Sequence, residues 1–226
     1  EVYTRDSLKD IVALNQLSPD EFKGKIFYVR FAGNVTINDA KAQPNNPDTW
    51  DIADDTRLWA VKDTVDLIRR NGGVVVLHTH FEPKGNNLKD PQSIRFLVPS
   101  LKKILKVKDI AFVSDILGSA KQNALMSAIP GDVILLENLR LDKEIAKMEK
   151  AEGDTPEAVA ARNKLAALLY TGTNSANPKA NVVYVNDSFD AANRDNASIS
   201  AETTGIPRLA GLSFVKELTY WIKAIR

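Results

Sequence analysis

Short runs of apolar, β-favouring residues alternate with stretches of helical periodicity along most of the chain. The runs predict strands at 25–31, 74–79, 110–115, 133–137 and 182–186. Each run is almost continuously apolar, as expected for a strand of a parallel sheet that is covered on both faces. All of them are far shorter than the roughly 20 residues needed to cross a bilayer, so we expect no membrane span.

The clearest helix lies between the first two predicted strands, from Leu58 to Asn71. Polar residues at 54–56 can cap its start, and Gly72-Gly73 can end it. Further helices are predicted at 94–105, 119–128 and 155–170. Because strands separated by single helices are typical of βαβ units, we predict an α/β fold over residues 1–226. Its expected form is a doubly wound, mainly parallel sheet with helices on both faces.

Two segments interrupt this alternation. Asn38 to Thr49 is rich in Asn, Asp and Pro, and Thr171 to Ala180 precedes the last predicted strand. Both are predicted to be loops because their residues favour turns over regular structure.

Composition narrows the possible functions. The 226 residues include 30 Lys and Arg, 29 Asp and Glu, and no Cys. This near-neutral balance removes the usual electrostatic basis for nucleic-acid binding, and the absence of Cys excludes disulfides, thiolate zinc sites and Cys nucleophiles. We expect a soluble globular chain, and the sequence leaves the compartment open between the cytoplasm and an organellar matrix.

Polar residues follow the predicted strands, where ligands bind in open α/β sheets. They are Gly33 and Asn34; His78, Thr79 and His80; Asp115; Asn138 and Arg140; and 186–194. Arg57, Arg140 and Arg194 near one crevice would suit a phosphate or a carboxylate, because each guanidinium offers a fork of donors. The alternative is that these arginines are solvated or form structural ion pairs.

Other chemistry has weaker support. His78 and His80 would need a third ligand to hold a metal, and local hydrogen bonding is the favoured interpretation of both. Asp115 as a phospho-acceptor would need an acidic pair and a distal lysine that the sequence does not place. Neither common glycine-rich nucleotide motif is present. We therefore expect no bound cofactor and no metal.

Several motifs resemble phosphoglycerate kinase, in that family's order. They are KGKIFYVRFAGNV (23–35), DDTR (54–57), GDVILLENLRLDKE (131–144), YVNDSFDAANRDNAS (184–198), GIPRLAG (205–211) and KEL (216–218). The resemblance covers about residues 8 to 222. It implies the family's N-terminal domain, which holds 3-phosphoglycerate, whereas the glycine-rich segments of the nucleotide-binding C-terminal domain have no counterpart here.

The implied substrate site departs from the family pattern. Ala32 replaces an Asp that contacts the substrate, Thr36 replaces a Pro, and Glu82 falls where the family has a phosphate-contacting Arg. That last exchange would remove a charge-assisted hydrogen bond of about 1.5–3 kcal/mol and add repulsion toward the substrate. Further along, Asp190, Asn193 and Asn196 stand where the family has a Gly and two His.

The resemblance leaves a vestigial substrate site of Asn34, Arg57, Arg140 and Arg194. None is assigned as catalytic, although Arg57 is the family-equivalent position.

Three functional hypotheses remain. The departures favour a catalytically inactive, structural or interaction subunit of a larger assembly, with other protein subunits as partners. The alternative is the 3-phosphoglycerate-binding half of an active kinase whose nucleotide domain lies on another chain or beyond this sequence. A module that weakly binds a different phosphorylated small anion is the third.

Overall fold

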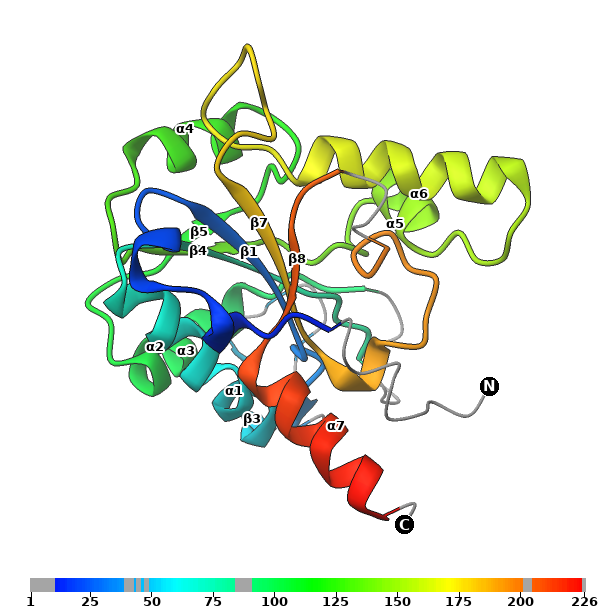
Figure 1. Cartoon of the computed structure of the whole chain (residues 1–226). Helices are drawn as coiled ribbons and strands as arrows, with labels where there is room; N and C mark the ends of the chain where they lie inside the picture. Colours follow the sequence, from blue (N-terminus) through cyan, green and yellow to red (C-terminus); the bar gives the residue numbers. More distant parts are fainter. Residues whose placement is uncertain are drawn as a thin grey trace.

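The computed structural model describes residues 11–38, 43, 46, 49–83, 91–200 and 205–224. Its centre is a six-stranded parallel sheet in the order β5-β6-β4-β1-β7-β8 (Figure 1). The strands are β1 (Ile26–Phe31), β4 (Val74–His78), β5 (Ala111–Val113), β6 (Val133–Leu136), β7 (Val182–Asp187) and β8 (Arg208–Ala210). The predicted doubly wound α/β sheet is confirmed, and β8 is added to the strands that the apolar runs predicted.

The chain changes direction across the sheet at β1. After β1 it builds β4, β5 and β6 on one side, and then returns to add β7 and β8 on the other. Such a reversal opens a crevice beyond the carboxyl ends of the central strands. In register there, Arg30 of β1 lies opposite His78 of β4 and Asn186 of β7.

Seven α-helices are present in the described part of the chain. They are α1 (Thr56–Ala60), α2 (Lys62–Arg70), α3 (Val98–Leu105), α4 (Ser119–Ser127), α5 (Lys143–Glu149), α6 (Pro156–Leu169) and α7 (Leu212–Ala224). The helix predicted from Leu58 is divided by a turn at Val61 into α1 and α2. Helix α5 was not predicted; the Asp142 carboxylate caps it by accepting hydrogen bonds from the N–H groups of Glu144 and Ile145, both at 2.9 Å.

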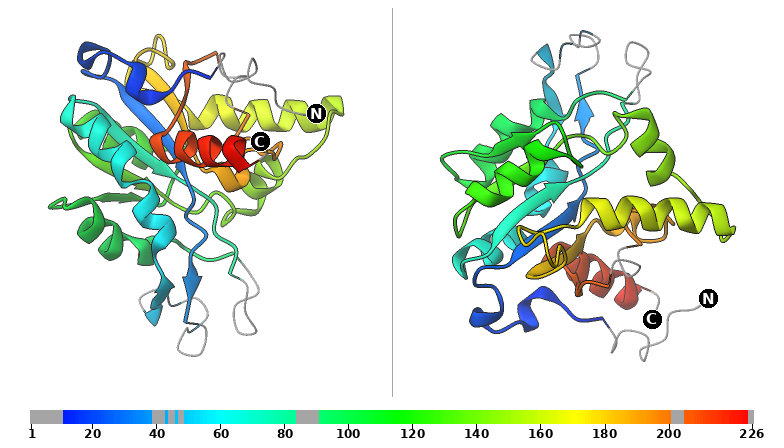
Figure 2. Two further views of the ribbon diagram at one scale, coloured as in Figure 1. Left: turned by 60° about the horizontal axis from the view of Figure 1, so that its bottom comes forward. Right: turned by 90° about the horizontal axis from the view of Figure 1, so that it is seen from above.

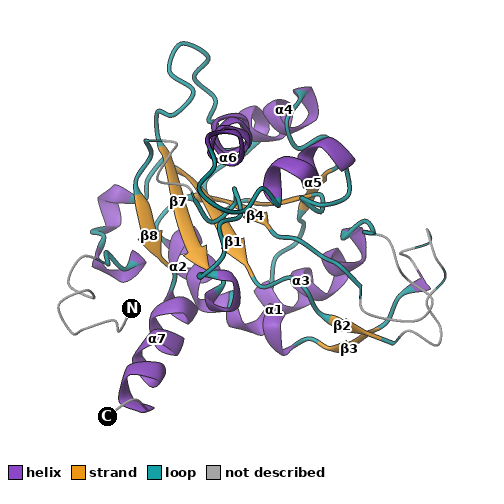
Figure 3. Cartoon of the chain, turned by 90° about the vertical axis from the view of Figure 1, so that its right-hand side faces the viewer, coloured by secondary structure: helices purple, strands orange, loops and turns teal. Residues whose placement is uncertain are grey.

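The helices cover both faces of the sheet. Helices α1, α2 and α3 pack on one face and α4 and α6 on the other, with α5 against α6 and α7 beside α2 and β7 (Figure 3). Alternate residues of β1 enter the two cores: Phe27 and Val29 face the first helix layer, and Tyr28 faces the second. This two-sided burial explains why the strands are almost continuously apolar.

A small antiparallel ladder projects from this body (Figure 2). It pairs β2 (Thr36–Ile37) with β3 (Ile52–Asp54). Most of the predicted loop at 38–49, which connects the two, lies outside the described residues. Across the described chain, no helix combines the length and apolarity that a bilayer crossing requires.

Candidate anion site at the carboxyl ends of the strands

Charged side chains gather beyond β1, β4, β6 and β7. Arg30 is the second-last residue of β1, and the loop after β4 carries His80 and Glu82. Arg140 follows β6, and Asp190 follows β7. Helix α5 adds Glu149 and Lys150 at its C-terminal end. The crevice is therefore lined from four strands and one helix, with more charge than the arginines alone supply.

Arg30 is fully buried and anchors the inner part of the crevice. Its Nε donates to Ser198 Oγ at 3.0 Å, and its Nη1 donates to Phe31 O at 2.6 Å and to Thr79 Oγ1 at 3.0 Å. Its Nη2 contacts His80 Nδ1. Each of the three guanidinium nitrogens thus has a protein acceptor, so we interpret Arg30 as a structural cation.

Glu149 supplies the negative charge that balances Arg30. Its Oε1 accepts from Ser198 Oγ at 2.5 Å, and its Oε2 accepts from Ser198 N at 2.9 Å. Because complete burial disfavours the charged form, it raises the pKa of Glu149, while the nearby Arg30 opposes that rise. A single hydroxyl, that of Ser198, therefore links the buried carboxylate to the buried guanidinium.

His80 is held neutral in this cluster. Burial and then the positive charge of Arg30 lower the pKa of its imidazole to about 2. Since Nδ1 faces a guanidinium donor, it acts as the acceptor, and the ring proton is on Nε2. A neutral, buried His80 can orient a neighbour, and it adds no positive charge to the crevice.

The outer part of the crevice contains a three-residue ion cluster around Glu82. Arg140 Nη1 lies 2.6 Å from Glu82 Oε2, and Lys150 Nζ contacts Glu82 Oε1. The side chain of Arg140 is only 6% exposed, whereas that of Glu82 is 37% exposed. Partial burial alone would raise the pKa of Glu82, but the Lys150 hydrogen bond and the charge of Arg140 outweigh it and lower that pKa.

A second ion pair lies on the β7 side. Arg57, in the first turn of α1, reaches Asp190 Oδ2 at 3.0 Å, with both side chains nearly half exposed. Ser188 Oγ donates to the other oxygen of Asp190 at 2.7 Å. The pair borders a pocket of about 280 Å³ that Ala32 also lines. Asp190 therefore brings a carboxylate to the pocket beside the position where the family's Asp is replaced by Ala32.

The four residues predicted for the site fall in different surroundings. Arg57 and Arg140 are each paired with a carboxylate of this chain. Asn34 Oδ1 accepts a hydrogen bond from Glu82 N at 3.2 Å and so supports the loop after β4. Arg194 is exposed, and its charge contributes to the lowered pKa of His80.

The histidines occupy two different environments. His78 ends β4 inside an aromatic cluster, where its Nε2 lies 3.0 Å from Tyr170 Oη. Burial lowers the pKa of His78 well below its ordinary value. Among the described residues, no group of three or more His, Cys, Asp or Glu is arranged to hold a metal ion. Asp115 follows β5, which two strands, β6 and β4, separate from β1.

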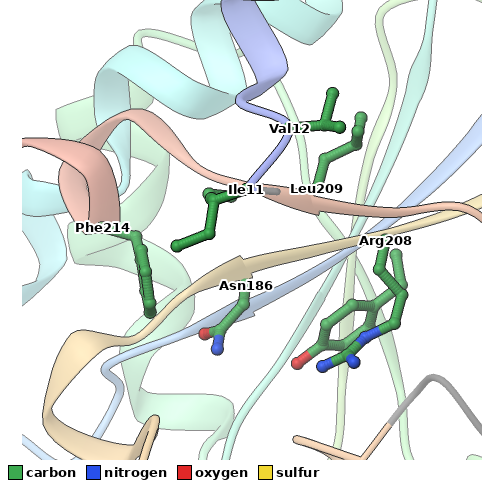
Figure 4. Close-up of a pocket in the computed structure, with 8 residues that line it drawn as sticks. Ile11, Val12, Asn186, Arg208, Leu209 and Phe214 are labelled. Atoms are coloured by element: carbon green, nitrogen blue, oxygen red, sulfur yellow. The ribbon is translucent and has the colours of Figure 1, made fainter. Parts of the chain in front are cut away.

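Two other hollows lie near the outer edge of the sheet. One, of about 230 Å³, lies along β7 and β8 (Figure 4), where the guanidinium of Arg208 lies 5.8 Å from the ring centre of Tyr184 and donates to Ile199 O. The other, of about 470 Å³, lies beside α7 and is lined mainly by apolar residues, including Phe214, Leu218 and Trp221. Trp221 is 47% exposed there, so the hollow presents apolar side chains at the surface.

Sequence reasoning missed much of the inner network. Arg30 is the one charge within an otherwise apolar strand, and this isolation was a usable signal of a buried, paired cation. Glu149 and Lys150 belong to a charge-dense segment to which the sequence analysis assigned no role in the site. Glu82 was expected to repel a substrate; that it neutralises Arg140 depends on a contact across 58 positions of sequence.

Comparisons with known proteins agree with the motifs. A family model described as phosphoglycerate kinase matches residues 17–226. The phosphoglycerate kinase of Cereibacter sphaeroides is 32% identical over 199 residues, which cover 88% of this chain and 42% of that protein. The chloroplastic phosphoglycerate kinase 2 of Arabidopsis thaliana is 33% identical over 215 residues, covering 94% and 38%.

A solved structure gives the same result for the fold. The phosphoglycerate kinase of Pyrococcus horikoshii superposes with a TM-score of 0.70 at 20% identity, covering 95% of this chain and 45% of that one. The chain thus spans less than half the length of these relatives and corresponds to their N-terminal part.

Proposed function

Because the chain belongs to the phosphoglycerate kinase family, we propose that it is the 3-phosphoglycerate-binding half of such a kinase. In this proposal the nucleotide domain that phosphoryl transfer requires is supplied by another chain or by sequence outside these 226 residues. The observation that carries the proposal is that Arg57, Arg140 and Arg194 lie around the crevice at β1, where the order of strand addition reverses. Doubly wound sheets bind their ligands at this crevice.

The charge of the outer crevice fits an anionic ligand. It holds four cations, namely Arg57, Arg140, Arg194 and Lys150. Glu82 pairs with Arg140 and Lys150, and Asp190 pairs with Arg57. Two further carboxylates, those of Asp187 and Glu217, line the pocket beside Arg57. 3-Phosphoglycerate carries a carboxylate and a phosphate ester, about three negative charges near neutral pH. The four cations attract such an anion, and the carboxylates among them weaken this attraction.

A titration tests this proposal. We expect 3-phosphoglycerate to saturate the chain in isothermal calorimetry, and Arg194→Gln to weaken binding about tenfold through loss of one charge-assisted contact. Arg70→Gln is the matched control, because Arg70 is an exposed arginine at the end of α2, before β4 begins. Absence of saturation, or equal effects of the two substitutions, would contradict the proposal.

Activity requires a second measurement. Mixed with a separately produced nucleotide domain of a phosphoglycerate kinase, the chain should support transfer of phosphate from ATP to 3-phosphoglycerate. Positioning by both halves is needed because this transfer is catalysed almost entirely by orientation and charge neutralisation. A mixture that binds 3-phosphoglycerate without transferring phosphate would favour the second candidate.

That second candidate is a catalytically inactive module within a protein assembly. The two carboxylates paired with Arg57 and Arg140 favour it, as does the apolar hollow beside Trp221. It predicts that phosphorylated metabolites leave the melting temperature of the isolated chain unchanged, and that native mass spectrometry detects the endogenous chain only in a complex. Stabilisation by a phosphorylated anion other than 3-phosphoglycerate would instead favour a different small-anion ligand.

A further inference from the structure

We propose that Glu82 is an internal competitor for the anion site: its carboxylate occupies the position between Arg140 and Lys150 where an anionic group of a ligand would bind. Ligand binding then requires Glu82 to leave, and this competition sets both affinity and selectivity. The inference rests on the proposed function only for the identity of the ligand, since the competition applies to any anion that reaches Arg140.

The contacts of Glu82 are those expected of a bound anion. Its two oxygens are divided between two cations: Oε2 with Arg140 at 2.6 Å, and Oε1 with Lys150. The two cations come from the loop after β6 and from the end of α5. A carboxylate held by cations from separate elements reproduces the way in which a phosphate or carboxylate ligand is recognised.

Arg140 retains donor capacity that Glu82 does not use. The buried Nε of Arg140 has no hydrogen-bond partner among the described residues. A guanidinium binds a planar or tetrahedral anion best through two parallel hydrogen bonds, and Glu82 engages it through Nη1. A second anionic oxygen would satisfy a buried donor that is otherwise left unpaired, and such a donor is costly to leave unsatisfied.

The difference in exposure makes Glu82 the displaceable partner. Arg140 is 6% exposed and Glu82 is 37% exposed. A carboxylate with one side in water can rotate outward and be solvated, whereas the buried guanidinium has no comparable alternative. The backbone of Glu82 is held by the hydrogen bond from its N–H to Asn34 Oδ1 at 3.2 Å, so displacement needs only side-chain rotation.

The pKa of Glu82 offers a direct measure of its displacement. Its hydrogen bond with Lys150 and the charge of Arg140 outweigh partial burial and lower this pKa in the ligand-free chain. An anion that takes over these two cations removes the stabilisation of the carboxylate and adds a nearby negative charge. Both changes raise the pKa.

Glu82→Gln tests the competition by removing the charge while keeping the shape. We expect the variant to bind sulfate and 3-phosphoglycerate about tenfold more tightly than the parent chain. Glu157→Gln is the matched control, because it removes an exposed carboxylate from the first turn of α6 and should leave both affinities unchanged. Circular dichroism of each variant verifies the fold.

The sulfate series separates this inference from the proposed function. If neither chain binds 3-phosphoglycerate but Glu82→Gln gains sulfate affinity, the proposed function fails and the competition stands. Equal sulfate affinity in Glu82→Gln and the parent chain would overturn the competition, whatever 3-phosphoglycerate does.

A measurement on the parent chain covers the case in which the variant does not fold. Carbon-detected NMR can follow the carboxyl resonance of Glu82 through a pH titration, with and without saturating sulfate. Sulfate should raise the pKa of Glu82. An unchanged pKa of Glu82 at saturation would mean that the anion binds elsewhere, and the proposal would be wrong.

Discussion

The inner and outer parts of the crevice differ in how deeply their charged side chains are buried. In the inner part, Arg30 and Glu149 are fully buried, and the Ser198 hydroxyl links them by accepting from Arg30 and donating to Glu149. In the outer part, Arg57 and Asp190 form an ion pair with both side chains nearly half exposed. A buried charge loses its hydration permanently and must be paired, whereas an exposed charge can exchange its partner for water.

This difference separates the buried, structural Arg30 from the arginines that we propose bind the ligand. Removing one member of the inner network should destabilise the fold, because its partner remains buried and uncompensated. Removing one member of an outer pair should change ligand affinity and leave stability almost unaltered. Arg140 lies between these cases, since it is itself buried but its partner Glu82 is accessible to water.

The largest effect is expected for Arg30→Met. It leaves the Glu149 carboxylate buried without its cation, so the free energy of unfolding should fall by about 3–5 kcal/mol in urea denaturation. The double variant Arg30→Met with Glu149→Gln should recover part of this loss, because the uncompensated charge is gone. Exposed Arg70→Met should stay within about 0.5 kcal/mol of the parent chain. If Arg30→Met lowered the free energy of unfolding by less than about 0.5 kcal/mol, the distinction between the two regions would be wrong.

An intermediate effect is expected for Asp187, which is buried but only partly satisfied. Its Oδ1 accepts from Phe214 N at 3.1 Å, and its Oδ2 has no partner among the described residues. Burial raises the pKa of this carboxyl from 3.8 to about 6. The folded state therefore holds the proton more tightly than the unfolded state does, so the protonated group favours folding.

The resulting pH dependence has a definite sign. As pH rises from about 4 to 7, Asp187 should lower the free energy of unfolding by about 3 kcal/mol, at roughly 1.4 kcal/mol per unit of pKa. Asp187→Asn should remove this fall in urea denaturation series at several pH values. Asp109→Asn, at an exposed carboxylate, should reproduce the parent curve. If the free energy of unfolding of Asp187→Asn fell with pH as steeply as that of the parent chain, the prediction would be wrong.

The smallest effect on stability is expected for Asp190→Asn. The Arg57–Asp190 pair is about half exposed, and ion pairs of this kind contribute about 0–1 kcal/mol. The amide oxygen of Asn can still accept the hydrogen bond from Ser188 Oγ. Thermal unfolding should therefore be almost unchanged, and a loss above about 2 kcal/mol would show that the outer pair is structural too.

Much of the fold could be predicted because its local signals are strong. The run over β1 is apolar at nearly every position since Phe27 and Tyr28 face different cores. Helix α5 was missed because its charge-dense sequence lacks a wide apolar stripe, and the Asp142 cap was the only local signal. The interruption at Val61 also has no clear local signal, because the apolar spacing continues through it.

The candidate site was only partly predictable. The arginines could be placed near one crevice because polar residues after parallel strands meet at one edge of the sheet. Their partners could not, because Asp190 lies 133 positions from Arg57 and Glu82 lies 58 positions from Arg140. A local sequence pattern cannot indicate which residues so far apart in the chain form an ion pair.

The sequence by itself determined the alternation of strands and helices, the parallel sheet and the family, because each depends on short-range periodicity or on contiguous motifs. Only the tertiary structure decided which charged side chains are buried with fixed partners and which are exposed enough to exchange a partner for water. Burial depends on every element that surrounds a side chain. Arg30 and Arg57 are the same residue type, and only their surroundings bury one of them completely and leave the other in a half-exposed ion pair.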